Sequence, residues 1–180
     1  SNMNENIKNE LAKRAIFRAQ SGLYFLQDVV LPHIQSGTDA AYSRSAYILL
    51  SFNTELVLNA LFILGSKKTS EADIMKDLVS ASKSHNLENL FNRIPKESRF
   101  GIQSAVRKNV NGFVRYDIKL NNSVVTVEDF TDVRYDFKKN ALRSINQNEG
   151  TALKDSTSLL LDFVRKIISN SINFDIPKKP

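Results

Sequence analysis

The feature that most constrains this chain is the stretch from Ala40 to Leu64, which contains neither Gly nor Pro. In its sequence SAYILLSFNTELVLNALFIL, apolar residues occupy most of the circumference of a helix. Gly65 follows directly and is a typical helix stop. We therefore expect one long helix that lies in the middle of the domain.

A single polar stripe interrupts this helix. Ser51, Glu55 and Asn59 fall four residues apart and therefore share one face. A buried carboxylate without a partner is costly, so we expect either a partner for Glu55 or a stripe that meets water. For the first alternative we predict an ion pair between Glu55 and Arg134.

Most of the remaining chain also has helical signals. Pro32 ends or kinks the first helix, because it lacks an amide hydrogen and disfavours helical geometry at the residue before it. Ser70 is a typical N-cap for a short third helix. The helices predicted beside the central one cover about 6–34, 70–81, 84–94, 96–110, 126–137 and 151–171.

The connectors are less clear. The stretch 113–126 is ambiguous, since Val124, Val125 and Val127 suggest extended structure, and 138–150 is typical of a loop. Because helices dominate, the predicted fold class is all-α: an up-and-down bundle of long antiparallel helices with short accessory helices and a long irregular connector.

Length and composition favour one domain. The chain has 180 residues, 42% of them hydrophobic, which is enough for a single sizeable core. Ser1 and Asn2 precede Met3 and resemble an expression-tag remnant, so we expect a helical domain over 3–175 and a flexible tail over 176–180. No secretory signal is recognisable at the start, and the apolar runs are short or interrupted, so we expect a cytoplasmic protein that does not enter a membrane.

Few residues are available for catalytic chemistry. There is no Cys and there are only two histidines, His33 and His85, which excludes disulfides and thiolate metal sites. The chain has no Gly-rich phosphate loop, no spaced set of metal ligands and no Gly-x-Ser-x-Gly elbow. We expect no cofactor, no metal and no recognisable catalytic residue. His85, beside Ser84 and Asn86, is interpreted as a local hydrogen-bonding or packing residue.

Positive charge is concentrated in the second half of the chain. Residues 1–92 hold nine basic and nine acidic side chains, whereas 93–180 hold sixteen and ten. The densest part, 93–119, has seven basic residues against Glu97 and Asp117. Such a patch either attracts phosphates or acidic partners, or is only a solvated surface.

A near-repeat lies in the same half, VRYDIK at 114–119 and VRYDFK at 133–138. The copies start 19 residues apart, a period too short for a repeat of helix pairs. The second copy follows Phe130 in helical spacing, so Arg134 is the predicted structural ion-pair partner. Arg115, in the first copy, is the predicted exposed one.

Three motifs taken in order, SFNTELVLNALFIL, SHNLENLFNRIP and FTDVRYDF, resemble the HEPN superfamily (higher eukaryote and prokaryote nucleotide-binding domains) over about 43–137. The resemblance implies a compact helical bundle that usually dimerises. Many members are RNases with an Arg followed by four to six residues and a His. The nearest Arg before His33 is Arg18 and the nearest before His85 is Arg44, so this motif is absent.

The resemblance and the charge pattern together predict a non-catalytic binding module, a homodimer that binds RNA or a nucleotide. Charge and aromatic stacking would act through Arg107, Lys108, Arg115, Tyr116 and Lys119. The alternative is a regulatory component of a bacterial defence or toxin–antitoxin-like system, which would bind an acidic protein partner and no nucleic acid. A third interpretation, an enzyme with a pocket formed by Glu55, Arg134 and Tyr135, has the least support, because paired charges of this kind are more often structural.

Overall fold

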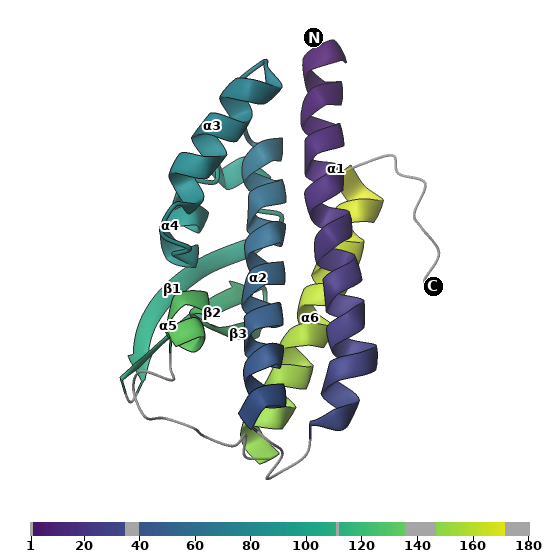
Figure 1. Ribbon diagram of the computed structural model, residues 1–180. Helices are drawn as coiled ribbons and strands as arrows, with labels where there is room; N and C mark the ends of the chain where they lie inside the picture. The colour runs from purple at the N-terminus through teal and green to yellow at the C-terminus, as the bar shows by residue number, and fades with distance from the viewer. Residues whose placement is uncertain (1, 35–39, 111, 136–146, 172–180) are drawn as a thin grey trace.

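The computed structural model describes residues 2–34, 40–110, 112–135 and 147–171. Three long helices lie beside a small antiparallel sheet and several short helices (Figure 1). In chain order the elements are α1 (Asn2–Phe25), η1 (Leu26–Val30), η2 (Leu31–His33), α2 (Ala40–Leu64), α3 (Glu71–Ser82), α4 (Leu87–Asn92), η3 (Lys96–Ser98), β1 (Ile102–Val110), β2 (Phe113–Leu120), β3 (Ser123–Glu128), α5 (Phe130–Tyr135) and α6 (Gln147–Ser171).

The long helices follow the sequence signals. α2 has the predicted bounds and is the central element, in contact with α1, α6, the short helices and β3. α1 passes into the π-helical turn η1 and the 3₁₀ turn η2, and the backbone becomes extended at Ile34, so the predicted end of the first helix near Pro32 is confirmed. Ser70 caps α3 by accepting a hydrogen bond from the Asp73 amide at 3.2 Å.

The prediction of an all-α bundle is wrong, because the structure contains a three-stranded antiparallel sheet in the order β1-β2-β3. The segment 96–110, predicted as a helix, forms the 3₁₀ turn η3 and then β1. The ambiguous stretch 113–126 supplies β2 and most of β3, and the helix predicted over 126–137 begins only at Phe130. The loop predicted at 138–150 falls partly on α6, which begins at Gln147, and otherwise outside the described residues.

The helix predicted over 96–110 is wrong because residues 110 and 113 are paired across a tight turn between two strands. Asn111-Gly112 resembles a helix stop, but an Asn-Gly pair between two extended runs is also the strongest short-range signal of a β-hairpin. Gly112 has a φ of +81°, and its amide donates to Oδ1 of Asn109 at 3.1 Å. The connection therefore turns the chain back and pairs β1 with β2 in register.

The two faces of the sheet have different surroundings. The inner face is apolar and buried in the core, and includes Val114, Tyr116, Ile118, Val125 and Val127. We call the opposite side the outer face; its residues are Ser104, Val106, Lys108, Val110, Phe113, Arg115, Asp117, Lys119, Val124, Thr126 and Glu128. Direct cross-strand partners share a face, so the register alone assigns these positions.

Both edges of the sheet receive a side chain from a helix. On β1, the amide of Arg107 donates to Oε2 of Glu88 in α4 at 2.7 Å. On β3, the amide of Thr126 donates to Oγ of Ser156 in α6 at 3.1 Å. Unpaired strand edges are templates for unwanted pairing, and these two contacts satisfy one edge amide on each side.

The near-repeat adopts two different structures. VRYDIK lies within β2, whereas the first three residues of VRYDFK end α5. The remaining residues of the second copy lie outside the described residues. The two copies are therefore not two copies of one binding element.

The stretch Arg44–Leu64 of α2 is long and apolar enough to cross a membrane, by length and composition only. Within the fold, 61% of the 18-residue apolar window in this stretch is buried. Core helices have this property, so the finding is weak evidence for a membrane span.

Candidate nucleic-acid interface

The register brings three of the predicted binding residues onto the outer face. Lys108 on β1 lies directly opposite Arg115 on β2, and Lys119 follows along the same strand. Lys119 is exposed, and the side chains of Lys108 and Arg115 are 48% and 38% exposed. These three cations therefore form one solvent-facing group.

Asp117 lies at the centre of this group. Its Oδ2 accepts from Nζ of Lys108 at 2.5 Å, and its Oδ1 lies 3.6 Å from Nε of Arg115. Thr126 Oγ1 also donates to Oδ1 at 3.4 Å. One carboxylate thus partly neutralises two of the three cations and fixes their positions.

Tyr116 lies on the opposite face and does not join the group. It is 1% exposed, and its hydroxyl donates to Oδ2 of Asp129 at 2.6 Å. Burial, and then the neighbouring Asp129 carboxylate, raise the pKa of Tyr116 well above its ordinary range. The prediction that Tyr116 stacks on a base is therefore wrong: the ring is part of the core.

Arg107 is the direct partner of Tyr116 in the register and lies on the edge strand. Its side chain is exposed, and its positive charge near the Tyr116 hydroxyl acts against the pKa increase. Arg107 is thus displaced from the outer face, although it remains accessible along the edge of β1.

A cavity of about 200 Å³ adjoins the outer face at its hairpin end. It is enclosed by strand residues, by Tyr47 of α2 and by the first turns of α6. The lining residues are Tyr47, Val110, Phe113, Arg115, Thr126, Glu128, Glu149, Ala152 and Leu153. Nε of Arg115 is buried and makes no hydrogen bond, and the Tyr47 hydroxyl donates to Oε2 of Glu149 at 3.3 Å.

Sequence reasoning missed Phe113 as an interface residue. Side chains alternate along a strand, so residues 113, 115, 117 and 119 of β2 face one way and 114, 116 and 118 the other. The partly exposed aromatic ring next to Arg115 is therefore Phe113, not Tyr116. The Asn-Gly hairpin signal, combined with this alternation, would have identified it.

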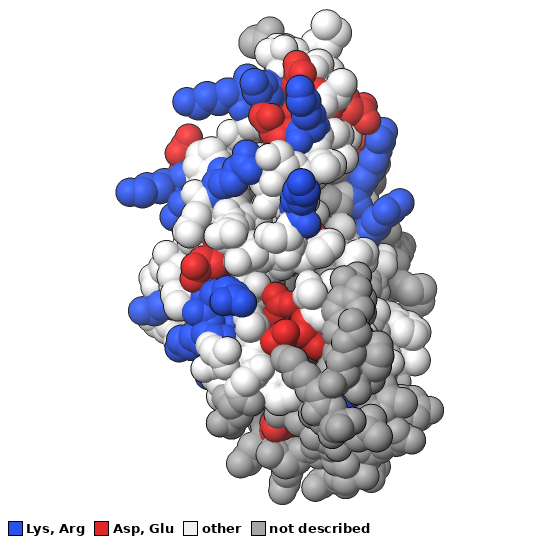
Figure 2. All heavy atoms as spheres, turned by 60° about the vertical axis from the view of Figure 1, so that its left-hand side comes forward, with Lys and Arg blue, Asp and Glu red and all other residues white. Residues whose placement is uncertain are grey.

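Two other basic residues of 93–119, Arg93 and Arg99, have intramolecular partners. Nε of Arg99 donates to the carbonyl of Ile94 at 2.9 Å, and its guanidinium lies over the ring of Phe91. Nη1 of Arg93 donates a hydrogen bond to Oγ of Ser80 at 3.5 Å. Figure 2 shows basic side chains spread over the face turned forward, with acidic ones among them, so the positive charge is distributed rather than gathered in one continuous patch.

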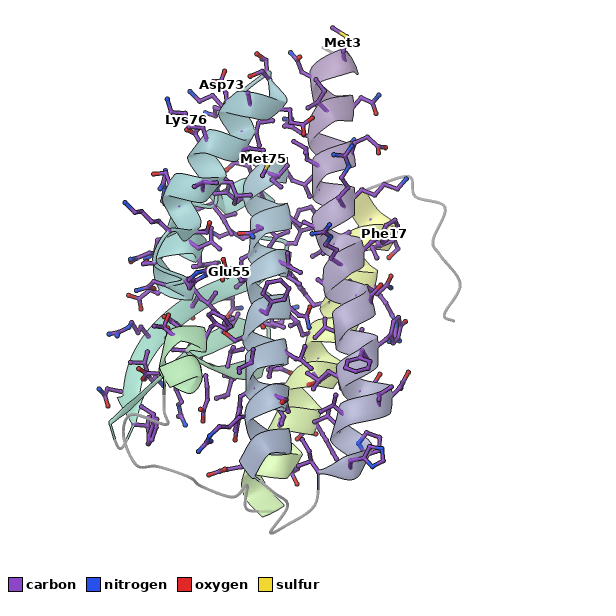
Figure 3. All side chains as sticks on the ribbon, viewed as in Figure 1. Met3, Phe17, Glu55, Asp73, Met75 and Lys76 are labelled. Atoms are coloured by element: carbon purple, nitrogen blue, oxygen red, sulfur yellow. The ribbon has the colours of Figure 1, made fainter. Side chains whose placement is uncertain are left out.

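Glu55 lies in a separate place, on the middle of α2, and points towards the side of α4 and α5 (Figure 3). Its Oε2 lies 3.0 Å from Nδ1 of His85, in the connection between α3 and α4. The ring of His85 makes an edge contact with Phe130 of α5, with 5.5 Å between centroids. The side chains of Arg134 and Tyr135 lie outside the described residues, so the predicted Glu55–Arg134 pair is untested.

Within the described residues, no group of three or more His, Cys, Asp or Glu side chains could hold a metal ion. Comparisons with protein-family models, with curated proteins and with solved structures find no match to this chain. The arrangement of side chains therefore carries the functional argument.

Proposed function

We propose that this protein is a binding module for single-stranded RNA, with the outer face of the sheet as its interface. The observation that carries the proposal is the shared position of Lys108, Arg115 and Lys119 on one exposed face. Phosphates bind such groups by charge, and single-stranded RNA adds stacking of its bases on accessible rings. Phe113 is the aromatic residue of this face.

Long-range attraction supports the same ligand. The formal net charge of the chain is +6, which favours encounter with a polyanion. We attribute binding, and no catalytic step, to the interface. On the motif resemblance alone, we also propose a relationship to the HEPN superfamily and a homodimeric state.

The test is a titration of a fluorescently labelled single-stranded RNA, followed by anisotropy at two salt concentrations. We expect the double variant K108A/K119A to bind the RNA more weakly. Its plot of log affinity against log salt concentration should also be less steep, by roughly 0.7 in slope for each phosphate that the variant no longer neutralises. A denaturing gel of the same samples checks that the RNA stays intact.

The matched control is K67A/K68A, which removes two exposed lysines from the connection between α2 and α3. It has the same net charge as K108A/K119A. Equal loss of affinity in the two variants, or no binding by the wild type at low salt, would refute the proposal.

A protein partner is the second candidate, because the outer face also exposes apolar side chains. Val106, Val110 and Val124 are 42%, 36% and 50% exposed. An acidic partner would contact these valines together with the lysines. A V106S/V124S variant that keeps its RNA affinity but no longer binds a protein partner would favour this candidate.

A further inference from the structure

We infer that the free edge of β1 is a docking site for an acidic, extended segment of a partner protein, which adds to the sheet as a fourth strand. The free edge is the side of residues 106–110 that faces away from β2. The strand order β1-β2-β3 gives β1 a neighbour on one side only, and in Figure 1 its arrow forms the outer margin of the sheet. This inference does not depend on RNA binding, because it concerns the edge of the sheet and not its outer face.

The backbone groups of this segment point alternately to β2 and to the free edge. The amide of Arg107 points to the edge, since it donates to Oε2 of Glu88 at 2.7 Å. Because peptide groups alternate in direction along an antiparallel strand, Asn109 also directs its N–H and C=O outward, whereas Lys108 directs both towards Arg115 on β2. Residues 107 and 109 therefore present the hydrogen-bonding groups that a further strand requires.

The outward groups are accessible. Every residue from 106 to 110 is exposed, whereas Ile102 and Ala105 in the first half of β1 are buried. Within the described part of the chain, the hydrogen bond from the Arg107 amide to Glu88 is the only one made by the outward backbone groups of residues 107 and 109. An exposed strand edge of this kind is a template for the addition of an extended peptide.

Glu88 shows where the added strand ends. Its Oε2 takes the place in which the carbonyl oxygen of a neighbouring strand would accept the Arg107 amide. Glu88 lies in the first turn of α4, and this is its one contact with the backbone of β1. The carbonyl of Arg107 and both peptide groups of Asn109 are thus left for an added strand.

The charges of the edge determine which segment fits. Arg107 and Lys108 are both exposed, and as consecutive residues of a strand they project from opposite faces. A second copy of β1 placed antiparallel would bring these cations against each other, and like charges on opposing residues are destabilising. Acidic residues at the facing positions would instead pair with them. Asp117 already contacts Lys108 from the β2 side, and the added strand would place a carboxylate on the other side.

The register also predicts the sequence pattern of the partner. Val106 and Val110 lie on either side of Lys108 on the outer face and are 42% and 36% exposed, so apolar residues suit the positions opposite them. We choose antiparallel pairing because its ladder is the more stable one. Opposite residues 110 to 106, in that order, the partner should read apolar, polar, acidic, acidic, apolar. The peptide VTEEV with blocked ends is the probe.

The first experiment is a charge swap, in which NMR of the labelled full chain measures the affinity of the blocked peptides VTEEV and VTKEV. The third residue of each peptide faces Lys108. We expect the wild type to bind VTEEV about five- to tenfold more tightly than VTKEV, and the K108E variant to prefer VTKEV, since opposite charges on facing residues attract and like charges repel. K68E makes the same change of charge in the connection between α2 and α3, and it should keep the preference of the wild type.

The second experiment tests the backbone pairing. With VTEEV at about ten times its Kd, the amide of Asn109 should exchange its hydrogen about tenfold more slowly, because only the unbound fraction exposes it. N-methylation of the peptide's Thr, which faces Asn109, should weaken binding about tenfold, because a donor to the edge is lost and a methyl group takes its place. N-methylation of the first Glu is the matched control and should change the affinity less than about twofold, since that amide points away from β1.

The outcomes separate this inference from the proposed RNA interface. Equal affinity of the wild type for the two peptides, or no binding of either, would refute the docking site whatever the RNA titration shows. A charge swap without slower exchange at Asn109 would also refute it, because the peptide would then contact side chains and not the strand edge. Thermal melting of K108E and K68E confirms that both variants are folded under the conditions of the titration.

Discussion

Nδ1 of His85 lies 3.0 Å from Oε2 of Glu55 and joins the α3–α4 connection to the centre of α2. His85 has a φ of +52°, in the left-handed region that residues with a side chain seldom adopt. The backbone conformation and the contact with Glu55 together position the ring against Phe130 of α5. This contact thus connects three elements that are separate in the sequence.

We predict a measurable coupling between these two side chains. His85→Asn replaces the imidazole ring with the side chain of a residue that tolerates positive φ. Glu55→Gln removes the negative charge of the carboxylate. Because His85 is 42% exposed, the coupling energy in a double-mutant cycle should be only about 0.5–1 kcal/mol. Urea denaturation of the four proteins measures it, and strictly additive effects would contradict it.

A second double-mutant cycle tests Arg134, the partner of Glu55 that was predicted from the sequence. Glu55→Gln combined with Arg134→Met should be non-additive if Arg134 also contacts the carboxylate. Additive effects of these two substitutions, beside a coupled Glu55 and His85, would leave the imidazole as the partner of Glu55.

Tyr116→Phe should destabilise the fold by about 1–3 kcal/mol, because it leaves the buried Oδ2 of Asp129 without its donor. The effect should also depend on pH. The pKa of Tyr116 is raised in the folded state, whereas a tyrosine in an unfolded chain ionises near pH 10. The unfolded state therefore releases this proton first, and stability falls as pH rises through about 10.

The check is urea denaturation of the wild type and of Tyr116→Phe at about pH 8 and at pH values above about 10. The wild type should lose more stability over that interval than the variant, which has no proton to release there. Lysines and the other tyrosines titrate in both proteins and cancel in the comparison. Equal losses would show that burial of Tyr116 has no effect on its ionisation.

Gly22→Ala should weaken the packing between α1 and α2. A Cβ at this position would lie 2.2 Å from Oδ1 of Asn53, a side chain that is itself buried on α2. Overpacking of this kind typically costs about 1–3 kcal/mol. The double variant Gly22→Ala, Asn53→Ala should recover part of the loss in thermal melting, and no recovery would place the strain elsewhere.

Ser156→Ala should destabilise the fold by about 1–2 kcal/mol, since the amide of Thr126 loses its acceptor at the edge of β3. Ser158→Ala is the matched control, because Ser158 is exposed on the same helix. Size-exclusion chromatography should also show more self-association for Ser156→Ala, as expected of an uncovered edge. Equal melting temperatures of the two variants would contradict the assigned role.

Asp117→Asn should increase affinity for single-stranded RNA, by about two- to tenfold at low salt. The carboxylate neutralises Lys108 and Arg115, and its removal leaves both cations available to phosphates. Anisotropy titration beside D155N gives the comparison, since that variant removes one negative charge outside the interface. A D117N affinity equal to that of D155N would show that phosphates do not bind at this face.

Local sequence was sufficient for the elements whose signals are long and consistent. The bounds of α2 follow from 25 residues without Gly or Pro, followed by Gly65. Ser70 fixes the start of α3 through its own side chain. Apolar spacing also predicts the last helix, although α6 begins at Gln147 rather than at residue 151. In each case the decisive interactions lie within one or two turns of the chain.

Only the tertiary structure decided the sheet. β1 is nine residues long and its burial does not alternate cleanly, so neither helical nor strand periodicity identifies it. The tripeptide Val-Arg-Tyr occurs in both copies of the near-repeat and adopts two structures. In the first copy it lies in β2, which pairs with β1 and β3, and in the second it ends α5, which the Asp129 carboxylate caps. Strand pairing is a contact between distant residues, and a short stretch of identical sequence cannot encode it.

The interface shows the same division. Composition located the positive charge in 93–119, and the sequence thereby identified Lys108, Arg115 and Lys119. The pairing register decided that these three share a face, that Asp117 lies among them and that Tyr116 points into the core. Residue types are fixed by the chain, but which of them meet is fixed by the alternation of side chains in a sheet that forms only when the whole domain folds.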